Sequence, residues 1–116
     1  MKASRFKINK GLENYKISQS FKYIGDDYWD WSVWIDANKE DIENIEYVTY
    51  NLHHTFINPV RVIRDRESKF KLETSGWGTF TIYAVLSFTN NTIIQLEHEL
   101  ELDYPKRVIK SIKKKK

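Results

Sequence analysis

The stretch FTIYAVLSFTNNTIIQLEHELEL, residues 80–102, decides the fold class. Every second residue from Phe80 to Phe88 is apolar and falls on one face, which is the period of two expected for a half-buried strand. Asn90-Asn91 follows as a tight turn, and the alternation resumes over residues 93–102. The stretch therefore predicts a β-hairpin with one face in a hydrophobic core.

Similar patterns along the rest of the chain predict an all-β protein. Five further segments are rich in β-branched and aromatic residues, namely residues 14–24, 29–36, 45–51, 60–64 and 70–74. In residues 29–36, Trp34 lies on the otherwise polar face, so we expect a loop or a partner to cover it. About seven to eight short strands of this kind favour an antiparallel β-sandwich of immunoglobulin type.

Composition fits a single soluble domain without covalent cross-links. The chain has 116 residues, 15% of them aromatic, and no cysteine, which excludes disulfides, thiolate zinc sites and cysteine nucleophiles. Residues 1–10 lack the apolar run of a signal peptide, and no stretch approaches the length of a transmembrane segment. We therefore expect a cytoplasmic protein.

Charge is divided unevenly along the chain. Residues 106–116 hold seven basic residues and no acidic one, whereas residues 1–105 hold the other 12 basic residues and all 16 acidic ones, a net charge of −4. We predict a domain over residues 1–105 followed by a basic C-terminal tail. Such a tail is more often a solvated end, but it can also bind phosphates or an anionic membrane surface.

Motifs for catalysis or metal binding are scarce. His53 and His54 are adjacent, so on an extended chain they point to opposite faces and do not easily share one metal. The glutamates of residues 97–101 alternate with apolar residues, as on a solvated strand face, and His98 on the apolar face reads as a core or rim histidine. We expect neither an enzyme, nor a cofactor, nor a metal site.

Two short segments interrupt the strand pattern and outline a binding site. Leu52–Phe56 reads LHHTF, and Ser75–Phe80 reads SGWGTF. If the strands bring both segments to one end of a sheet, Phe56 and Trp77 can face each other across a slot beside the Thr55 hydroxyl. The alternative is a bulge that swings Trp77 onto the end of the sandwich to cap the core, with Phe56 as its packing neighbour.

These residues carry a family resemblance. The run Val48–Leu102, with its LHHTF segment, the basic stretch over residues 59–64 and the SGWGTF segment, resembles a YEATS domain. Trp31–Ile35, which reads WSVWI, is similar to the first tryptophan-bearing core strand of that family. The sequences of residues 70–74 and 99–102 are more similar to the compact prokaryotic branch of the family than to its chromatin proteins.

The resemblance implies an immunoglobulin-like sandwich whose end loops hold an acylated lysine between aromatic planes. Phe56 and Trp77 would be these planes. Thr55 would hydrogen-bond the acyl amide, and the backbone N–H of Trp77 would hold the acyl carbonyl. His53 would shape the wall of the slot.

Further positions follow from the same resemblance. Gly76 and Gly78 would let the backbone approach the ligand closely. Glu99 falls where some family members have an acidic residue that contacts a basic residue of the peptide. The aromatic residue that precedes the first tryptophan strand in the family has two candidate counterparts here, Tyr28 and Trp29, and neither is in register.

Three functions therefore remain open. The first is a reader of acetyl- or crotonyl-type acyl-lysine on a peptide or protein. The second is a sensory or protein-interaction domain of a prokaryotic signalling or conflict system with a different ligand. The third is nucleic-acid or anionic-surface binding through Lys106–Lys116.

Overall fold

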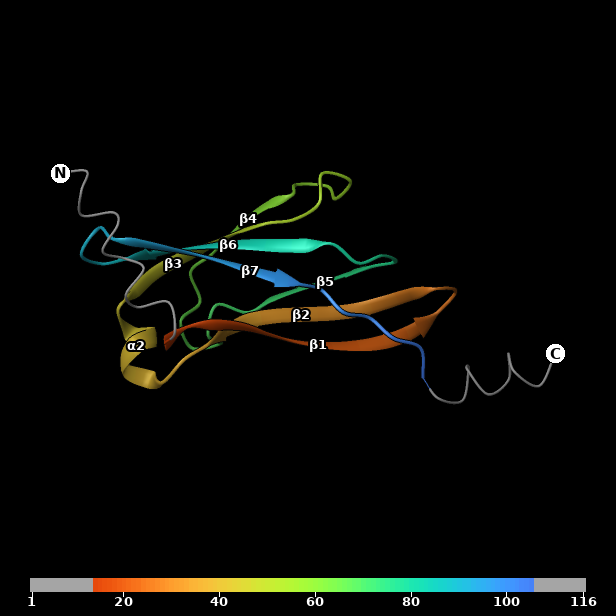
Figure 1. The fold of residues 1–116 in the computed structure, drawn as a ribbon, viewed down its shortest axis with the longest axis horizontal. Helices are drawn as coiled ribbons and strands as arrows, with labels where there is room; N and C mark the ends of the chain where they lie inside the picture. The colour runs from red at the N-terminus through yellow and green to blue at the C-terminus, as the bar shows by residue number, and fades with distance from the viewer. Residues whose placement is uncertain (1–13, 106–116) are drawn as a thin grey trace.

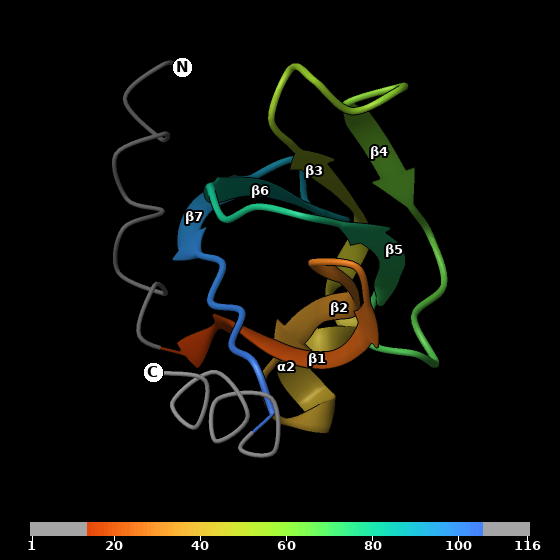
Figure 2. The same ribbon diagram turned by 90° about the vertical axis from the view of Figure 1, so that its right-hand side faces the viewer.

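Two antiparallel sheets form the domain in the computed structural model, which describes residues 14–105 (Figure 1). The first sheet has the order β1-β2-β5 and consists of β1 (Lys16–Gly25), β2 (Tyr28–Asp36) and β5 (Leu72–Gly76). The second has the order β4-β3-β6-β7 and consists of β4 (Val60–Ile63), β3 (Ile45–Asn51), β6 (Thr81–Phe88) and β7 (Ile93–Glu99). Figure 2 shows the sheets as two facing layers, which confirms the predicted immunoglobulin-like β-sandwich.

The predicted hairpin is β6 and β7. Ile82, Ala84 and Leu86 of β6 are fully buried, and Asn91 takes a φ of 72° in the turn. Strand β7 ends at Glu99, however, and not at residue 102. Beyond it the chain pairs with a side chain of the other sheet, since Gln19 accepts from the backbone N–H of Glu101 at 2.9 Å and donates to its carbonyl at 2.7 Å.

Gln19 also provides a hydrogen-bond partner for His98, the histidine on the apolar face of β7. His98 Nε2 lies 2.7 Å from Gln19 Oε1 and donates to it, because an amide oxygen can only accept. Burial lowers the pKa of His98, and the nearby Glu101 and Glu99 oppose that shift only in part. His98 is therefore a satisfied rim histidine, as predicted.

The core lies between the two sheets. Trp29, Trp31, Val33 and Ile35 on one face of β2 are at most 4% exposed, as the alternation predicted. Trp34 on the opposite face is half-buried, and the Lys71 ammonium, which lies just before β5, stands 5.6 Å from its ring centroid.

A buried hydrogen bond ties the segment before β5 to the second sheet. The Tyr50 hydroxyl on β3 donates to the Phe70 carbonyl at 2.7 Å, and both residues are fully buried. Burial raises the pKa of Tyr50 well above its ordinary value, so the hydroxyl remains a donor.

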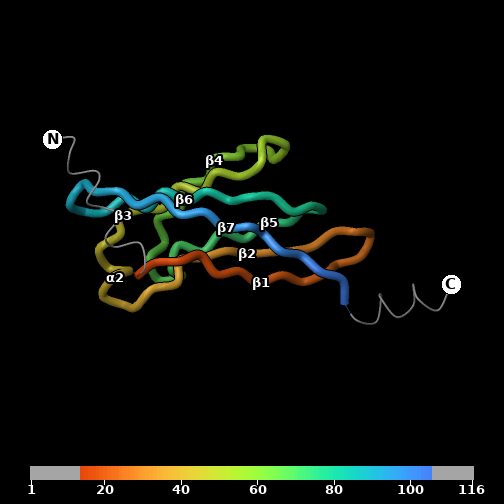
Figure 3. The backbone as a smooth tube through the Cα atoms, viewed as in Figure 1, coloured from red at the N-terminus to blue at the C-terminus, as the bar shows by residue number. Residues whose placement is uncertain are grey.

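Three connections gather at one end of the sandwich. The β1–β2 turn, the β3–β4 loop and the β5–β6 loop all lie at the right-hand end in Figures 1 and 3. The short helix α2 (Lys39–Glu43), capped by the Asn38 side chain, lies at the opposite end. Within residues 14–105 no helix is long and apolar enough to cross a bilayer. The basic segment 106–116 lies outside the described residues.

Candidate functional site

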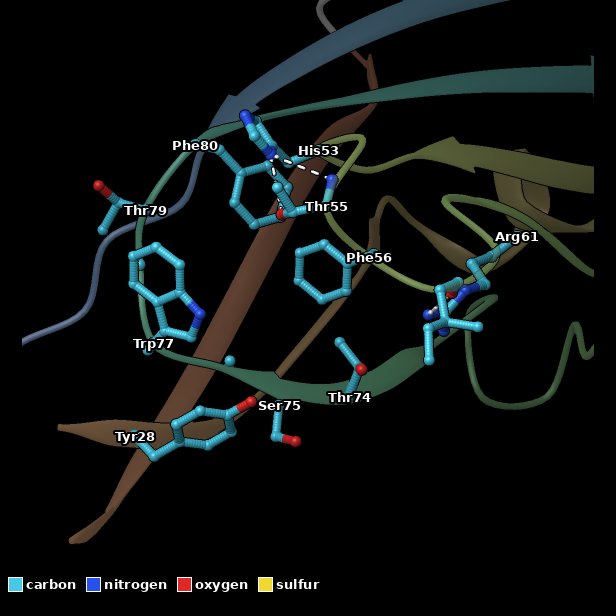
Figure 4. A pocket seen from close by; sticks show the side chains of 13 residues that line it. Tyr28, His53, Thr55, Phe56, Arg61, Thr74, Ser75, Trp77, Thr79 and Phe80 are labelled. Carbon is cyan, nitrogen blue, oxygen red and sulfur yellow. Dashed lines mark hydrogen bonds between the residues drawn. The ribbon is translucent and has the colours of Figure 1, made fainter. Parts of the chain in front are cut away.

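A hollow of about 460 Å³ opens between the β3–β4 and β5–β6 loops (Figure 4). Both segments singled out in the sequence contribute to it, so the structure brings them together at one end of the sandwich as expected. Its lining is mostly aromatic and hydroxyl-bearing. The lining residues are Tyr28, His53, Thr55, Phe56, Ile57, Arg61, Thr74, Ser75, Gly76, Trp77, Gly78, Thr79 and Phe80.

Backbone hydrogen bonds shape the β3–β4 loop. The Leu52 N–H donates to the Pro59 carbonyl at 2.8 Å and closes the loop, while the Phe56 N–H donates to the His53 carbonyl at 3.0 Å and forms a turn. Because the turn is not extended, the prediction that the two histidines point to opposite faces is wrong. The rings of His53 and His54 lie 4.3 Å apart, tilted by 32°.

The hydrogen bonds of this turn assign the proton on His53. The Thr55 backbone N–H donates to His53 Nδ1 at 3.3 Å, so Nδ1 carries a lone pair and the ring holds its proton at Nε2. The Thr55 hydroxyl lies 2.9 Å from the same nitrogen and must therefore donate to it. This leaves the lone pairs of Thr55 Oγ1 free to accept a hydrogen bond from a ligand N–H.

Phe56 forms a fixed wall of the hollow. Its ring packs edge-on against Trp31, with centroids 6.2 Å apart and an interplanar angle of 85°, and against Phe80 at 5.3 Å. The Trp31 indole N–H beneath it is buried without a hydrogen-bond partner. Phe80 was missed as a site residue, although it ends the SGWGTF segment, because its alternation with the β6 residues predicted a core role.

Trp77 forms the opposite wall and is unsupported by the core. It is 69% exposed, and within residues 14–105 its ring has no aromatic stacking partner, Phe56 included. Figure 4 shows Phe56 and Trp77 on separate walls, with open space between them. An exposed Trp77 is not what a bulge that caps the core predicts, and the choice between the two hypotheses stays a prediction.

The two glycines beside Trp77 provide room. Neither Gly76 nor Gly78 has a left-handed φ. A methyl group at Gly76 would lie 3.5 Å from Phe56 Cζ, whereas one at Gly78 would meet nothing within 4 Å. Because the two glycines have no side chains, the space between the walls stays open. Neither glycine is needed for an unusual backbone conformation.

The remaining predicted site residues are divided by the strand register. Tyr28 lines the hollow, but its neighbour Trp29 points the other way, is 4% exposed and donates from Nε1 to the Asp103 carbonyl at 2.8 Å. Glu99 lies outside the hollow and accepts from the Thr81 hydroxyl at 2.7 Å. Of these three residues only Tyr28 lines the hollow, and the contact of Glu99 with a bound peptide stays a prediction.

Arg61 is a lining residue that sequence reasoning did not single out. Its only signal was the basic stretch between the two motifs. The guanidinium folds back onto the β3–β4 loop, donating from Nη2 to the Ile57 carbonyl at 3.0 Å and from Nε to the Asn58 carbonyl. In the part of the chain that the structure describes, no group of three or more acidic, histidine or cysteine side chains is arranged to hold a metal ion.

Comparison with known proteins places this geometry in a family. The family model of the prokaryotic YEATS domain matches residues 29–101. Among curated proteins, the Protein AF-9 homolog of Kluyveromyces lactis is 36% identical over 77 residues, or 62% of this chain and 34% of that protein. Transcription initiation factor TFIID subunit 14b of Arabidopsis thaliana is 38% identical over 80 residues, or 65% of this chain and 29% of that protein. The chain spans about a third of the length of these relatives.

Solved structures agree. The Yaf9 YEATS domain recognizing an H3K122suc peptide is 26% identical with a TM-score of 0.60, covering 76% of this chain and 70% of that one. The Yaf9 YEATS domain bound to H3K27ac has a TM-score of 0.62 at 24% identity, with 81% and 73% of the two chains covered. The second likeness speaks for the fold alone.

Proposed function

The chain belongs to the prokaryotic YEATS domain family, and we propose that it is a non-enzymatic module that binds acylated lysine in the hollow between the β3–β4 and β5–β6 loops. A solved relative of the same fold recognizes an H3K122suc peptide, which supports a ligand of this class. The observation that carries the proposal is Trp77, a large aromatic side chain held 69% exposed opposite a Phe56 ring that is fixed by the core.

The chemistry of acylation suits such a site. A lysine ammonium is costly to strip of water, whereas its acylated form is neutral and ends in a flat amide with one donor and one acceptor. A planar amide fits between two aromatic walls. The acylated side chain can therefore enter where the free side chain is excluded.

Each polar group of the amide has a candidate partner. The Thr55 hydroxyl already donates to His53, so its free lone pairs can accept from the amide N–H. The backbone N–H of Trp77, the residue after β5, is the candidate donor to the acyl carbonyl. By analogy with aromatic pairs, stacking on Phe56 and Trp77 would contribute about 0.5–1.5 kcal/mol and each hydrogen bond about 1 kcal/mol. These terms come in addition to the free energy of burying the acyl chain, and with it we expect affinities in the micromolar range.

The decisive experiment is isothermal titration of the full chain with matched lysine peptides, acetylated, crotonylated and unmodified. We expect binding that requires the acyl group and that Trp77→Ala abolishes. Trp34→Ala is the matched control, because Trp34 packs under Lys71 on β2 and does not line the hollow. Equal binding by wild type and Trp77→Ala would overturn the proposal.

A second pair of variants tests the hydroxyl. Thr55→Ser keeps the hydroxyl and should retain binding, whereas Thr55→Val removes the acceptor and should weaken it by about fivefold. If Thr55→Val binds as tightly as Thr55→Ser, the amide N–H has no partner at this position and the assignment of Thr55 is wrong.

Two other hypotheses stay predictions, and the acylated peptides and a deletion variant distinguish them. A sensory or protein-interaction domain with a different ligand would bind none of the acylated peptides. Nucleic-acid or anionic-surface binding through Lys106–Lys116 would disappear when that segment is deleted and would weaken steeply with salt.

A further inference from the structure

The described part of the chain ends beside the β1–β2 turn. The Tyr104 hydroxyl donates to Asp27 Oδ1 in that turn at 2.6 Å. The indole N–H of Trp29 donates to the Asp103 carbonyl at 2.8 Å. The Tyr104 ring also packs edge-on against Tyr23 and Trp29, with centroids 5.3 and 5.1 Å away. These contacts hold residues 103 and 104 at the same end of the sandwich as the hollow (Figure 3).

Only one strand separates this anchor from the hollow. Tyr28, the first residue of β2, lines the hollow, and its neighbour Trp29 pairs with Gly76 of β5, another lining residue. Because neighbouring strands lie about 4.8 Å apart, the hollow begins within roughly 15 Å of Tyr104. An extended chain advances about 3.3 Å per residue, so Lys110, six residues after Tyr104 in the sequence, can reach about 20 Å. The segment that follows the anchor is therefore long enough to enter the hollow.

Charge favours contact between this segment and the domain. Residues 14–105 hold 8 basic and 15 acidic side chains, a net charge of −7, whereas residues 106–116 hold seven basic side chains and no acidic one. Asp26, Asp27 and Asp103 are exposed where the described chain ends. Opposite charges on two parts of one chain attract each other, and the covalent connection keeps the two parts at a high local concentration.

Six of the eleven residues in the segment 106–116 are lysines, namely Lys106, Lys110 and Lys113–Lys116. We propose that one of these lysines, once acylated, is bound by the hollow of the same chain. The inference rests on the proposed function and names a partner for that site. The acyl group would come from an acyl thioester. The neutral lysine Nζ attacks the thioester carbonyl, a C–N bond forms, the C–S bond breaks, and the thiolate leaves and takes up the proton that Nζ loses.

The covalent connection makes such a ligand effective. A short flexible linker gives an effective concentration on the order of 1 mM. Against a dissociation constant of about 10 µM, within the range expected for the hollow, the acylated chain would hold its own segment about a hundred times more often than not. An added peptide should then bind the acylated chain about a hundredfold more weakly than it binds the unmodified chain. Acylation of the segment would therefore close the site to other acylated proteins.

The test places acetyl-lysine at one chosen position by suppression of a stop codon. Six versions of the full chain carry it at one lysine of residues 106–116 each, and a seventh carries it at Lys39. Each version is titrated with the same acetyl-lysine peptide and compared with the unmodified chain. We expect at least one of the six to bind the peptide about a hundredfold more weakly. The version acetylated at Lys39 should match the unmodified chain, because Lys39 begins α2 at the opposite end of the sandwich.

Two controls separate the acyl group from the loss of a charge and from association between chains. Replacing the same lysine by serine, for example Lys110→Ser, removes the charge without adding an acyl group and should leave the affinity for the peptide within about twofold. Diluting the acetylated chain tenfold should not restore its affinity, because a ligand held within one chain is not lost on dilution. Recovery on dilution, or an equal loss of affinity in the serine variant, would overturn the inference.

Failure of the two proposals can be told apart. If the unmodified chain binds the acetyl-lysine peptide and all six acetylated chains bind it equally well, the acyl-lysine function stands and the inference is wrong. If the unmodified chain binds no acylated peptide, the proposed function itself fails, and the inference that rests on it fails with it.

Discussion

The two aromatic walls of the hollow should differ sharply in what they contribute to stability. Phe56 packs on Trp31 and Phe80, whereas Trp77 is 69% exposed. We compare Phe56→Ala with Trp77→Ala. If Trp77 is held open for a ligand, its removal should cost binding and little folding free energy, while removal of Phe56 should cost both.

The magnitudes follow from burial. A tryptophan side chain has an accessible surface of roughly 250 Å², and about a third of that surface is buried in Trp77. At about 25 cal/mol/Å² this burial contributes at most about 2 kcal/mol. Alanine retains part of that contact, and we expect Trp77→Ala to lower the free energy of unfolding by about 1 kcal/mol. Truncating Phe56 also leaves a cavity against Trp31 and Phe80, and about 3 kcal/mol is the expected cost.

Urea denaturation followed by far-ultraviolet circular dichroism is the assay, because the signal does not depend on which tryptophan is removed. Both variants should unfold in one transition with the slope of wild type, so that midpoints report stability. Equal destabilisation by the two substitutions would refute the reasoning. Trp77 would then be a structural cap, and its exposure could no longer support a binding role.

Three further predictions concern stability away from the hollow. Because burial lowers the pKa of His98, the unfolded chain binds a proton at this residue more readily than the folded chain does. The free energy of unfolding should therefore fall as the pH drops through about 6.5, and it should fall less in His98→Gln. Parallel pH profiles of the melting temperature for the two proteins would contradict this. Tyr50→Phe leaves the buried Phe70 carbonyl unpaired and should cost about 1–3 kcal/mol in thermal unfolding, so a change below about 0.5 kcal/mol would argue against that bond. Trp29→Phe removes the bond to the Asp103 carbonyl and should speed amide exchange near Asp103 but not in the core strands; unchanged exchange there would show that this contact does not hold the segment.

Local patterns in the sequence determine most of the fold. The alternation through β2 and β6 and the turn at Asn90-Asn91 predicted which faces are buried and where the hairpin lies, because a strand repeats every two residues whatever its neighbours are. The two segments that interrupt the alternation also predicted where the hollow lies, because a break in a strand pattern is visible in the local sequence. Seven strands of this kind have few ways to cover their apolar faces other than a two-sheet sandwich.

Non-local pairing decided the details of the site. Sequence left Tyr28 and Trp29 as equal candidates, and the pairing of β2 with β1 and β5 resolved them, since adjacent residues of a strand face opposite sides. Strand β7 ended early because Gln19, about 80 residues away along the chain, binds the backbone of Glu101.

The contrast is sharpest at the hollow itself. The sequence by itself determined that aromatic, hydroxyl and glycine residues interrupt two strands, because composition and spacing are local properties. Only the tertiary structure decided that Phe56 packs against Phe80 while Trp77 is 69% exposed, and that Arg61 lines the same hollow. Those features depend on loop closure and on contacts between distant segments, which no local period encodes.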